Sequence, residues 1–267
     1  MRAIAFLPMY DVAGTRGHAD ELWRAIRDAI RSRGIAAPEQ VDRSMARHQG
    51  WLHPDLVVGQ TCGLPYVTML CDKVELIGTP DYGVEGCPPG FYHSTLVAAS
   101  ADRRDRLAQF AGATLALNGK DSQSGYGAIM LAAAPYARDG RFFGQAIATG
   151  SHASAMRTVA EGRADLAAID SVTWRMSCLS GEGAGLKVIG TTEPTPGLPF
   201  IAALGKPAGQ LFDAIRAGLA GLPDPARRVF GVKDLVPLQR TDYQVITQNL
   251  QHAETAHRLP EPIKLET

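Results

Sequence analysis

The sequence has no excess of charge of either sign and few aromatic side chains. Lys and Arg together number 27, and so do Asp and Glu, in a chain of 267 residues. A chain without net charge has no overall field that attracts nucleic acid or an anionic membrane surface. Aromatic residues make up 7% of the chain and do not alternate with basic residues, which is the other pattern typical of nucleic-acid binding. We therefore expect no nucleic-acid partner.

Long apolar runs are also missing. No run approaches the roughly 18 residues that a membrane-spanning helix requires, so we expect no membrane insertion. The six-residue apolar run at 3–8 is shorter than the apolar region of a signal peptide, and no small-residue cleavage site follows it. We expect a cytoplasmic protein if the sequence is complete as given, and a periplasmic one if a leader has been removed from it.

The cysteines form no recognisable metal site. The chain has four of them and no C-x-x-C pair: Cys62, Cys71, Cys87 and Cys178. Since they do not alternate with histidine at the spacing of metal ligands, we expect no structural metal and no cofactor. Cys62 and Cys87 lie in Gly/Pro-rich turns on either side of one strand, so the sequence leaves both a disulfide and a reduced pair open.

What the sequence does contain is a regular alternation of strand-like and helix-like segments. Residues 2–7 are apolar on both faces, which is typical of a strand covered by helices, and residues 19–32 have apolar side chains at helical spacing. The charged run 102–106 and the proline-rich run 191–204 indicate two passages between lobes. We therefore predict an α/β protein of two lobes.

The stretch 118–126 is the strongest candidate for a binding site. It lies between a predicted strand, 114–117, and a helix-forming run, 128–134. The first N–H groups of a helix have no partner within the helix, and the summed peptide dipoles place about half a positive charge there. Two serine hydroxyls, Ser122 and Ser124, add donors, which predicts a pocket for a small anion. The alternative is that a serine only caps the helix.

Other predicted strands also end in polar residues. Thr61 follows the strand at 55–59, His152 follows Ser151 at a helix start, and Asp170 ends the strand at 164–170. In open α/β sheets, ligands bind at the carboxyl ends of the strands. A buried carboxylate needs a partner, so Asp170 binds either a donor of the protein, such as Thr173, or a cationic group of a ligand, which we favour.

Four motifs in order resemble one protein family. They are residues 60–66, 121–126, 150–152 and 164–174, and together they resemble the phosphate/phosphite/phosphonate-type substrate-binding proteins of ABC transporters. The likeness runs from about Leu7 to about Leu204. It implies a two-lobed type 2 periplasmic-binding-protein fold, with two mixed sheets covered by helices and two interlobe crossings. Its lobes would be residues 1–97 with 197–267, and residues 98–196.

The resemblance also implies a binding site between the lobes. In the family a Ser-x-Ser-Gly-Tyr turn holds phosphonate oxygens, and an acidic residue at a strand end pairs with the ligand's amine in aminophosphonate binders. Gln123 stands where a threonine is common, which leaves the identity of the ligand open. The ligand-binding residues implied here are Tyr10, Thr61, Tyr66, Tyr92, Asn118, Ser122, Gln123, Ser124, Gly125, Tyr126, His152 and Asp170.

We therefore predict a non-enzymatic solute-binding protein without catalytic residues. It would hold a small oxyanion, phosphonate-like or phosphate-like or zwitterionic, for uptake through an ABC transporter permease. One alternative is an enzyme on the same scaffold, with Ser122 or Ser124 as nucleophile, His152 as base and Asp170 as orienting group. The chain lacks a G-x-S-x-G elbow, which argues against it. Another alternative is a cytosolic ligand sensor.

Overall fold

The computed structural model describes residues 3–264, which form two compact units. Unit 1 comprises Met1–Phe91 and Pro196–Gln244, and unit 2 comprises Tyr92–Thr195 and Val245–Thr267. Both units combine mixed sheets with helices, which confirms the predicted α/β fold class. The chain passes between the units three times, once more than predicted, because the last boundary falls within helix α9.

Unit 1 is built on a five-stranded mixed sheet of order β1-β2-β11-β3-β12. Strands β1 and β2 are parallel, whereas β11 runs antiparallel to both of its neighbours. The strands are β1 (Ile4–Phe6), β2 (Leu56–Gln60), β3 (Val74–Asp81), β11 (Phe200–Ala203) and β12 (Asp234–Val236). The helices are α1 (Arg16–Arg31), α2 (Arg47–Trp51), α3 (Gly63–Pro65), α7 (Ala208–Ala220) and α8 (Asp224–Phe230), with α9 (Arg240–Ala256) at the C-terminal end.

Strand β11 lies in the middle of this sheet although its sequence predicts a crossing. All four of its residues are buried between β2 and β3. The prolines at 194, 196 and 199 precede it, and they are typical of irregular chain. Pairing on both edges therefore decides the structure of a segment whose local signal is weak.

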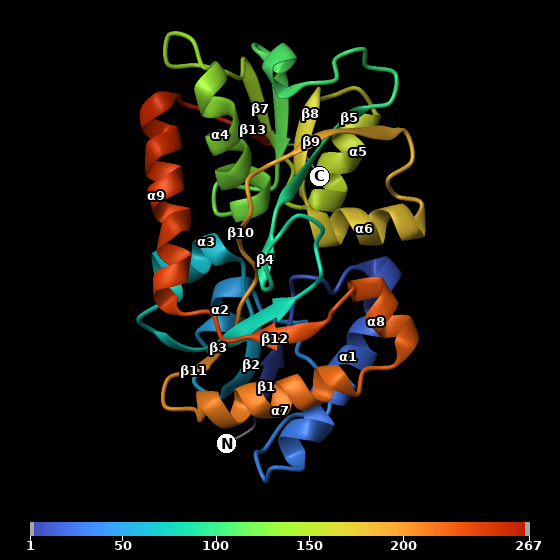
Figure 1. The fold of residues 1–267 in the computed structure, drawn as a ribbon, viewed down its shortest axis with the longest axis vertical. Coiled ribbons are helices and arrows are strands. Elements are labelled where there is room, and N and C mark those ends of the chain that lie inside the picture. The colour runs from blue at the N-terminus through green and yellow to red at the C-terminus, as the bar shows by residue number, and fades with distance from the viewer. Residues whose placement is uncertain (1–2, 265–267) are drawn as a thin grey trace. The chain divides into compact units, whose positions relative to one another are not determined.

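Helix α1 packs against α7 and α8, and α7 contacts strands β3 and β12 of the sheet (Figure 1). The apolar stripe of α1 is buried and consists of Leu22, Trp23, Ile26 and Ile30. Gly218 of α7 lies so close to α1 that an added Cβ would come within 2.7 Å of the carbonyl oxygen of Ala25. Only glycine allows the two helix backbones to approach in this way.

Unit 2 contains a six-stranded mixed sheet of order β13-β7-β6-β8-β5-β9. The strands are β5 (Ser94–Ala99), β6 (Thr114–Leu117), β7 (Gln145–Ala148), β8 (Leu166–Asp170), β9 (Leu186–Thr191) and β13 (Ile263–Lys264). The helices are α4 (Ala128–Ala133), α5 (His152–Ala160) and α6 (Ser171–Ser180). Two short strands, β4 (Phe91–Tyr92) and β10 (Thr195–Pro196), pair where the chain passes between the units.

Both faces of the unit 2 sheet are apolar because helices cover both of them. Along β6, Leu115 and Leu117 belong to the cluster that includes Ile129 of α4. Ala116 belongs instead to the cluster that includes Met156 of α5. Successive side chains of a strand point to opposite faces, so an unbroken apolar strand matches a sheet buried on both sides.

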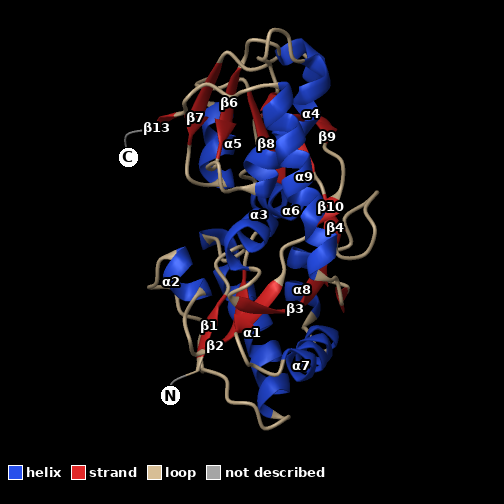
Figure 2. Cartoon of the chain, turned by 90° about the vertical axis from the view of Figure 1, so that its left-hand side faces the viewer, coloured by secondary structure: helices blue, strands red, loops and turns tan. Residues whose placement is uncertain are grey.

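The C-terminal residues join unit 2, whereas the sequence-based expectation places 197–267 in the first lobe. Strand β13 pairs with β7 in parallel, with Ile263 opposite Ile147, and Figure 2 shows it at that edge of the sheet. Ala253 of α9 is buried in the same apolar cluster as Leu115. The first boundary also lies earlier than expected, at 91/92 rather than 97/98, because β5 pairs with β8 and β9.

Replacing Leu115 with alanine tests the burial of this sheet. The side chain is completely buried, so Leu115→Ala is expected to lower the free energy of unfolding by about 3 kcal/mol through lost burial and a cavity. Urea unfolding measures the change. Leu179→Ala is the control, since Leu179 is exposed at the end of α6, and its effect is expected within about 0.5 kcal/mol. Equal losses for both variants would contradict the assigned core.

Candidate functional site

The turn after β6 forms an unusually wide helix start. Ser122 caps it, since its Oγ accepts a 3.0 Å hydrogen bond from the N–H of Gly125. The first helical turn, Gln123–Gly127, is a π-helix, and the carbonyl of Ser122 accepts from both Tyr126 and Gly127 at 3.1 Å. Single π-turns of this kind are rare in helices and frequent at functional sites. Capping by Ser122, left open by the sequence, is therefore part of the turn.

Ser124 and His152 come together at the carboxyl ends of β6 and β7. The hydroxyl of Ser124 lies 2.9 Å from Nε2 of His152, and the backbone N–H of Asp170 donates to the same nitrogen at 3.4 Å. Nε2 can accept from both groups when the ring is protonated at Nδ1. Ser151 caps α5 as predicted, accepting from the N–H of Ser154.

Asp170 is buried at the end of β8, with 2% of its surface exposed. Its Oδ1 accepts hydrogen bonds from the backbone N–H groups of Val172 at 2.8 Å and of Thr173 at 3.0 Å. The carboxylate thus caps α6 and lies where the helix dipole stabilises negative charge. The sequence left two partners open for this carboxylate, a donor of the protein and a cationic group of a ligand. The backbone N–H of Thr173 is a donor of the first kind.

Gln123 and Tyr126, both predicted to contact the ligand, direct their side chains into unit 2. The amide nitrogen of Gln123 lies 3.5 Å from Oγ1 of Thr195. The hydroxyl of Tyr126 donates to Oε1 of Glu254 at 2.8 Å. Burial, and secondly the bond to Glu254, raise the pKa of Tyr126 well above its usual range. At this turn the backbone N–H groups and Ser124 are therefore the better-placed donors to an anion.

Ser94 belongs to this cluster although the sequence did not single it out. Its hydroxyl donates to the carbonyl oxygen of Ser124 at 2.9 Å, and its N–H donates to Oγ1 of Thr192. Ser94 lies two residues after Tyr92 on a β-prone segment, and this period-two spacing is the signal that could have identified it. Tyr92 is buried in β4 and belongs to unit 2, although the expected lobes place it in the first.

The predicted residues of unit 1 lie near a second turn of similar construction. Thr61 follows β2, its N–H donates to the carbonyl of Pro199 at 3.2 Å, and α3 then leads into a π-turn, Tyr66–Leu70. Tyr66 is buried edge-on against Tyr243, with ring centroids 4.9 Å apart. Burial raises the pKa of Tyr66 to about 12. Both turns thus combine a strand end, a hydroxyl and a wide helix start.

Tyr10 is also buried in unit 1. Its ring packs edge-on against Tyr82 at a centroid distance of 5.2 Å, and its carbonyl accepts from the hydroxyl of Thr15. Asn118 of unit 2 opens the wide turn, and its carbonyl accepts from the N–H of Gly150 at 2.9 Å. Its side-chain oxygen lies beside Gly125. The structure therefore brings Asn118, Ser122, Ser124, Gly125, His152 and Asp170 into one cluster within unit 2.

The described residues show no metal cluster, no helix suited to span a membrane and no disulfide. Within residues 3–264, His, Cys, Asp and Glu side chains form no group of three or more that could hold a metal ion. Over the same residues no helix has the length and apolar character needed to cross a membrane. None of the four cysteines, all of which lie within the described residues, takes part in a disulfide in this structure, so Cys62 and Cys87 are not linked to each other.

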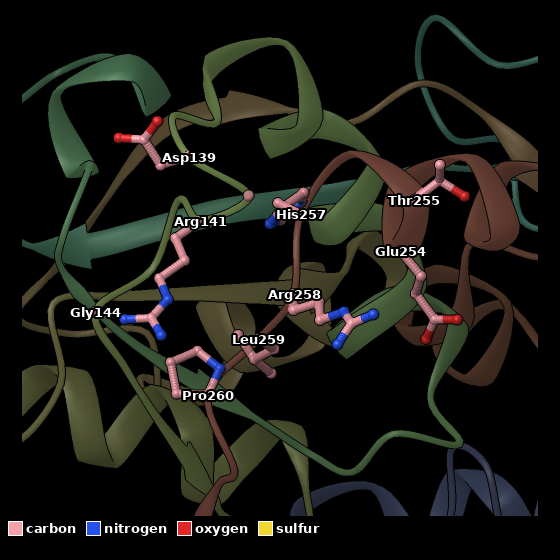
Figure 3. Close-up of a pocket in the computed structure, with 10 residues that line it drawn as sticks. Asp139, Arg141, Gly144, Glu254, Thr255, His257, Arg258, Leu259 and Pro260 are labelled. Atoms are coloured by element: carbon pink, nitrogen blue, oxygen red, sulfur yellow. The ribbon is translucent and has the colours of Figure 1, made fainter.

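A surface cavity of about 750 Å³ lies elsewhere in unit 2, around the end of α9. Figure 3 shows its wall, to which the loop at 139–144 and the residues around Glu254 and His257 contribute. None of the predicted ligand-binding residues lines it. Its lining includes two arginines, Arg141 and Arg258, and two carboxylates, Asp139 and Glu254, so these charges balance.

The chain matches known proteins in sequence family and in fold. Residues 55–243 match the family model described as "ABC transporter, phosphonate, periplasmic substrate-binding protein". No curated protein matches the sequence.

Solved structures of low sequence identity share the fold. PhnD1 from Prochlorococcus marinus, in complex with methylphosphonate, superposes with a TM-score of 0.72 at 13% identity, over 93% of this chain and 97% of that one. A binding protein component of an ABC phosphonate transporter from Pseudomonas aeruginosa gives 0.70 at 16% identity, over 96% and 87%. XAC2383 from Xanthomonas citri, bound to chloride, gives 0.65 at 18% identity, over 95% and 98%.

Replacing Gly125 tests the construction of the wide turn. A Cβ at this position would lie 2.9 Å from Oδ1 of Asn118 and 3.1 Å from Oγ of Ser122, so Gly125→Ala must displace the capping hydroxyl. We expect a loss of about 1 kcal/mol in the free energy of unfolding, the usual effect of a lost cap. Gly209→Ala is the control, because nothing lies within 4 Å of a Cβ there. Urea unfolding of both variants measures the difference, and a Gly125 variant as stable as the control would contradict the assigned cap.

Proposed function

The family match spans most of the chain, which therefore belongs to the periplasmic phosphonate substrate-binding proteins of ABC transporters, and we propose that unit 2 supplies the anion-binding turn. The ligand is a small tetrahedral oxyanion, phosphonate-like or phosphate-like. The observation that carries this proposal is the 2.9 Å pair of Ser124 and His152 at the first turn of a helix. There a hydroxyl, an imidazole and backbone N–H groups converge, and the helix dipole favours negative charge.

Neutral donors suit a compact anion. A hydroxyl and backbone N–H groups stabilise the charge of one tetrahedral group by short, directed hydrogen bonds. Nε2 of His152 lies within hydrogen-bond distance of the Ser124 hydroxyl and of the Asp170 N–H, and an imidazole nitrogen can donate or accept a hydrogen bond depending on its protonation. Tyr10, Thr61 and Tyr66 of unit 1 and Tyr92 of unit 2 are proposed as further ligand contacts.

The alternative function is an enzyme on the same scaffold. It would require a nucleophile next to a base, and Ser124 lies within hydrogen-bond distance of His152. In a catalytic triad the serine and the carboxylate contact opposite nitrogens of the histidine. Here the backbone N–H of Asp170 contacts the same nitrogen as Ser124, Nε2, and its Oδ1 caps α6. The orienting role expected of Asp170 in a triad is therefore not supported, and substrate binding without catalysis is the better account.

The family works with ABC transporter permeases in the periplasm, and we propose the same partner and compartment for this chain. Delivery to a permease requires a ligand held reversibly, which agrees with a site made of hydrogen bonds to neutral groups. A ligand sensor would use the same donors. Retention on a permease of the cognate transporter distinguishes the two roles.

Calorimetry with methylphosphonate, inorganic phosphate and phosphite tests the binding proposal. We expect saturable binding of at least one of them, and Ser124→Ala is expected to weaken it about tenfold, since one hydrogen bond to a charged group is lost. Ser180→Ala is the control, because Ser180 is exposed at the end of α6 and bonds only locally, to the carbonyl of Ser177.

Two outcomes would contradict the proposal. One is the absence of binding heat with all three anions. The other is covalent labelling of Ser124 by a fluorophosphonate, which would identify an activated serine and favour the enzyme.

Replacing Asp170 with asparagine tests whether the ligand carries an amino group. Asparagine caps helices as well as aspartate does, so Asp170→Asn is expected to fold normally while it loses the negative charge. If the carboxylate pairs with an ammonium, affinity for 2-aminoethylphosphonate falls about tenfold or more and affinity for methylphosphonate does not. Equal affinities of the variant and the wild type for both compounds would leave Asp170 as a helix cap alone.

A further inference from the structure

The wide turn at Gln123–Gly127 is held from outside by the C-terminal helix. Tyr126 is 4% exposed, and its hydroxyl donates to Oε1 of Glu254, on α9, at 2.8 Å. A hydrogen bond from a buried hydroxyl to a carboxylate is stronger than one between neutral groups. A tyrosine hydroxyl is protonated at neutral pH and can therefore donate this bond, and burial, followed by the bond to Glu254, raises the pKa of Tyr126 further.

A second bond joins the residues after α9 to the helix that follows the turn. His257 is 1% exposed, and its Nε2 donates to the carbonyl oxygen of Met130 at 2.8 Å. Met130 lies in the last turn of α4, where carbonyl groups have no partner within the helix. The bond therefore satisfies a helix end and fixes the histidine as the tautomer protonated at Nε2.

Apolar contacts connect the same elements. Ala253 is completely buried in the cluster that contains Tyr126, Ile129 and Met130, and Leu250 packs against it. Figure 3 shows Glu254 and His257 among the residues that line the surface cavity. Glu254 lies near the C-terminal end of α9, and His257 follows that end. Two polar bonds and a shared core thus join residues 245–257 to the segment 123–133.

We propose that Glu254 and His257 are positioning residues for the anion-binding turn, which rests on the proposed function of that turn. A π-turn needs support beyond its own hydrogen bonds, because its geometry is less favourable than that of an α-helix. The first turn here shares one carbonyl acceptor, that of Ser122, between two N–H groups. Glu254 fixes the turn at its centre through Tyr126, and His257 fixes the end of α4. The C-terminal segment thereby sets the direction of the backbone donors without touching the ligand.

The test compares Glu254→Ala, Glu254→Gln and Tyr126→Phe in the full chain. Methylphosphonate affinity is measured by calorimetry, amide hydrogen exchange is measured over residues 123–127, and stability is measured by urea unfolding. Glu254→Ala is expected to weaken methylphosphonate binding about tenfold and to speed exchange of these amides by a similar factor. Glu254→Gln keeps an acceptor oxygen and is expected to restore most of both.

Tyr126→Phe should match Glu254→Ala, and the double variant should lose no more than either single one, since both remove the same bond. Glu261→Ala is the control. Glu261 lies four residues after the segment 245–257. Its side chain is 88% exposed, and it forms an ion pair with Lys120 on the surface. Its replacement is expected to change neither affinity nor exchange.

The exchange measurement separates this proposal from the proposed function. If the wild type binds no oxyanion, the function fails, and faster exchange of residues 123–127 in Glu254→Ala still supports positioning. If Glu254→Ala lowers only the free energy of unfolding, with exchange of residues 123–127 equal to that of the wild type, Glu254 is merely structural and the proposal is overturned.

Discussion

The backbone N–H groups at the start of a helix must find acceptors outside it, and this requirement organises the candidate site of unit 2. At Gln123–Gly127 the helix opens as a π-turn, with Ser122 as its cap. N–H groups and the helix dipole at such a start can stabilise an anion, which is the basis of the proposed function. The rest of unit 2 brings other groups to the same place. β7 leads to His152 through a second capped helix start, and β8 leads to Asp170 at a third.

Three helix starts lie at one edge of this sheet, and they bring together a hydroxyl, an imidazole, a carboxylate and backbone N–H groups. The hydroxyl of Ser124 and the imidazole of His152 are paired at 2.9 Å. Oδ1 of Asp170 caps its own helix by accepting from the N–H of Val172, and the backbone N–H of Asp170 donates to Nε2 of His152. In sequence, a constellation of serine, histidine and aspartate is compatible with nucleophilic catalysis and with reversible binding, and these contacts support the binding that we propose. The residue types are the same, and only the atoms in contact distinguish the two.

Much of the fold could be predicted because local signals and tertiary contacts agree in most segments. Strand β6 begins and ends where its apolar residues do, and its pattern matches a sheet covered on both faces. Where local signals and tertiary contacts disagree, the tertiary contacts determine the structure. The central strand β11 follows a proline-rich run and could not be predicted from local sequence, because its pairing partners β2 and β3 are distant in the chain. The residues after Pro260 form β13 through parallel pairing with β7 at one edge of the sheet.

The sequence by itself determined the α/β class and the position of a strand-to-helix turn within 118–126, because each depends on neighbours within a few residues. Only the tertiary structure decided the partners of the side chains. The hydroxyl of Tyr126 donates to Glu254, 128 residues away, and the hydroxyl of Ser94 donates to the backbone carbonyl oxygen of Ser124. The tertiary structure also places residues 245–267 in unit 2. These outcomes follow from packing between distant segments, and no local periodicity encodes which of two buried surfaces a helix such as α9 will cover.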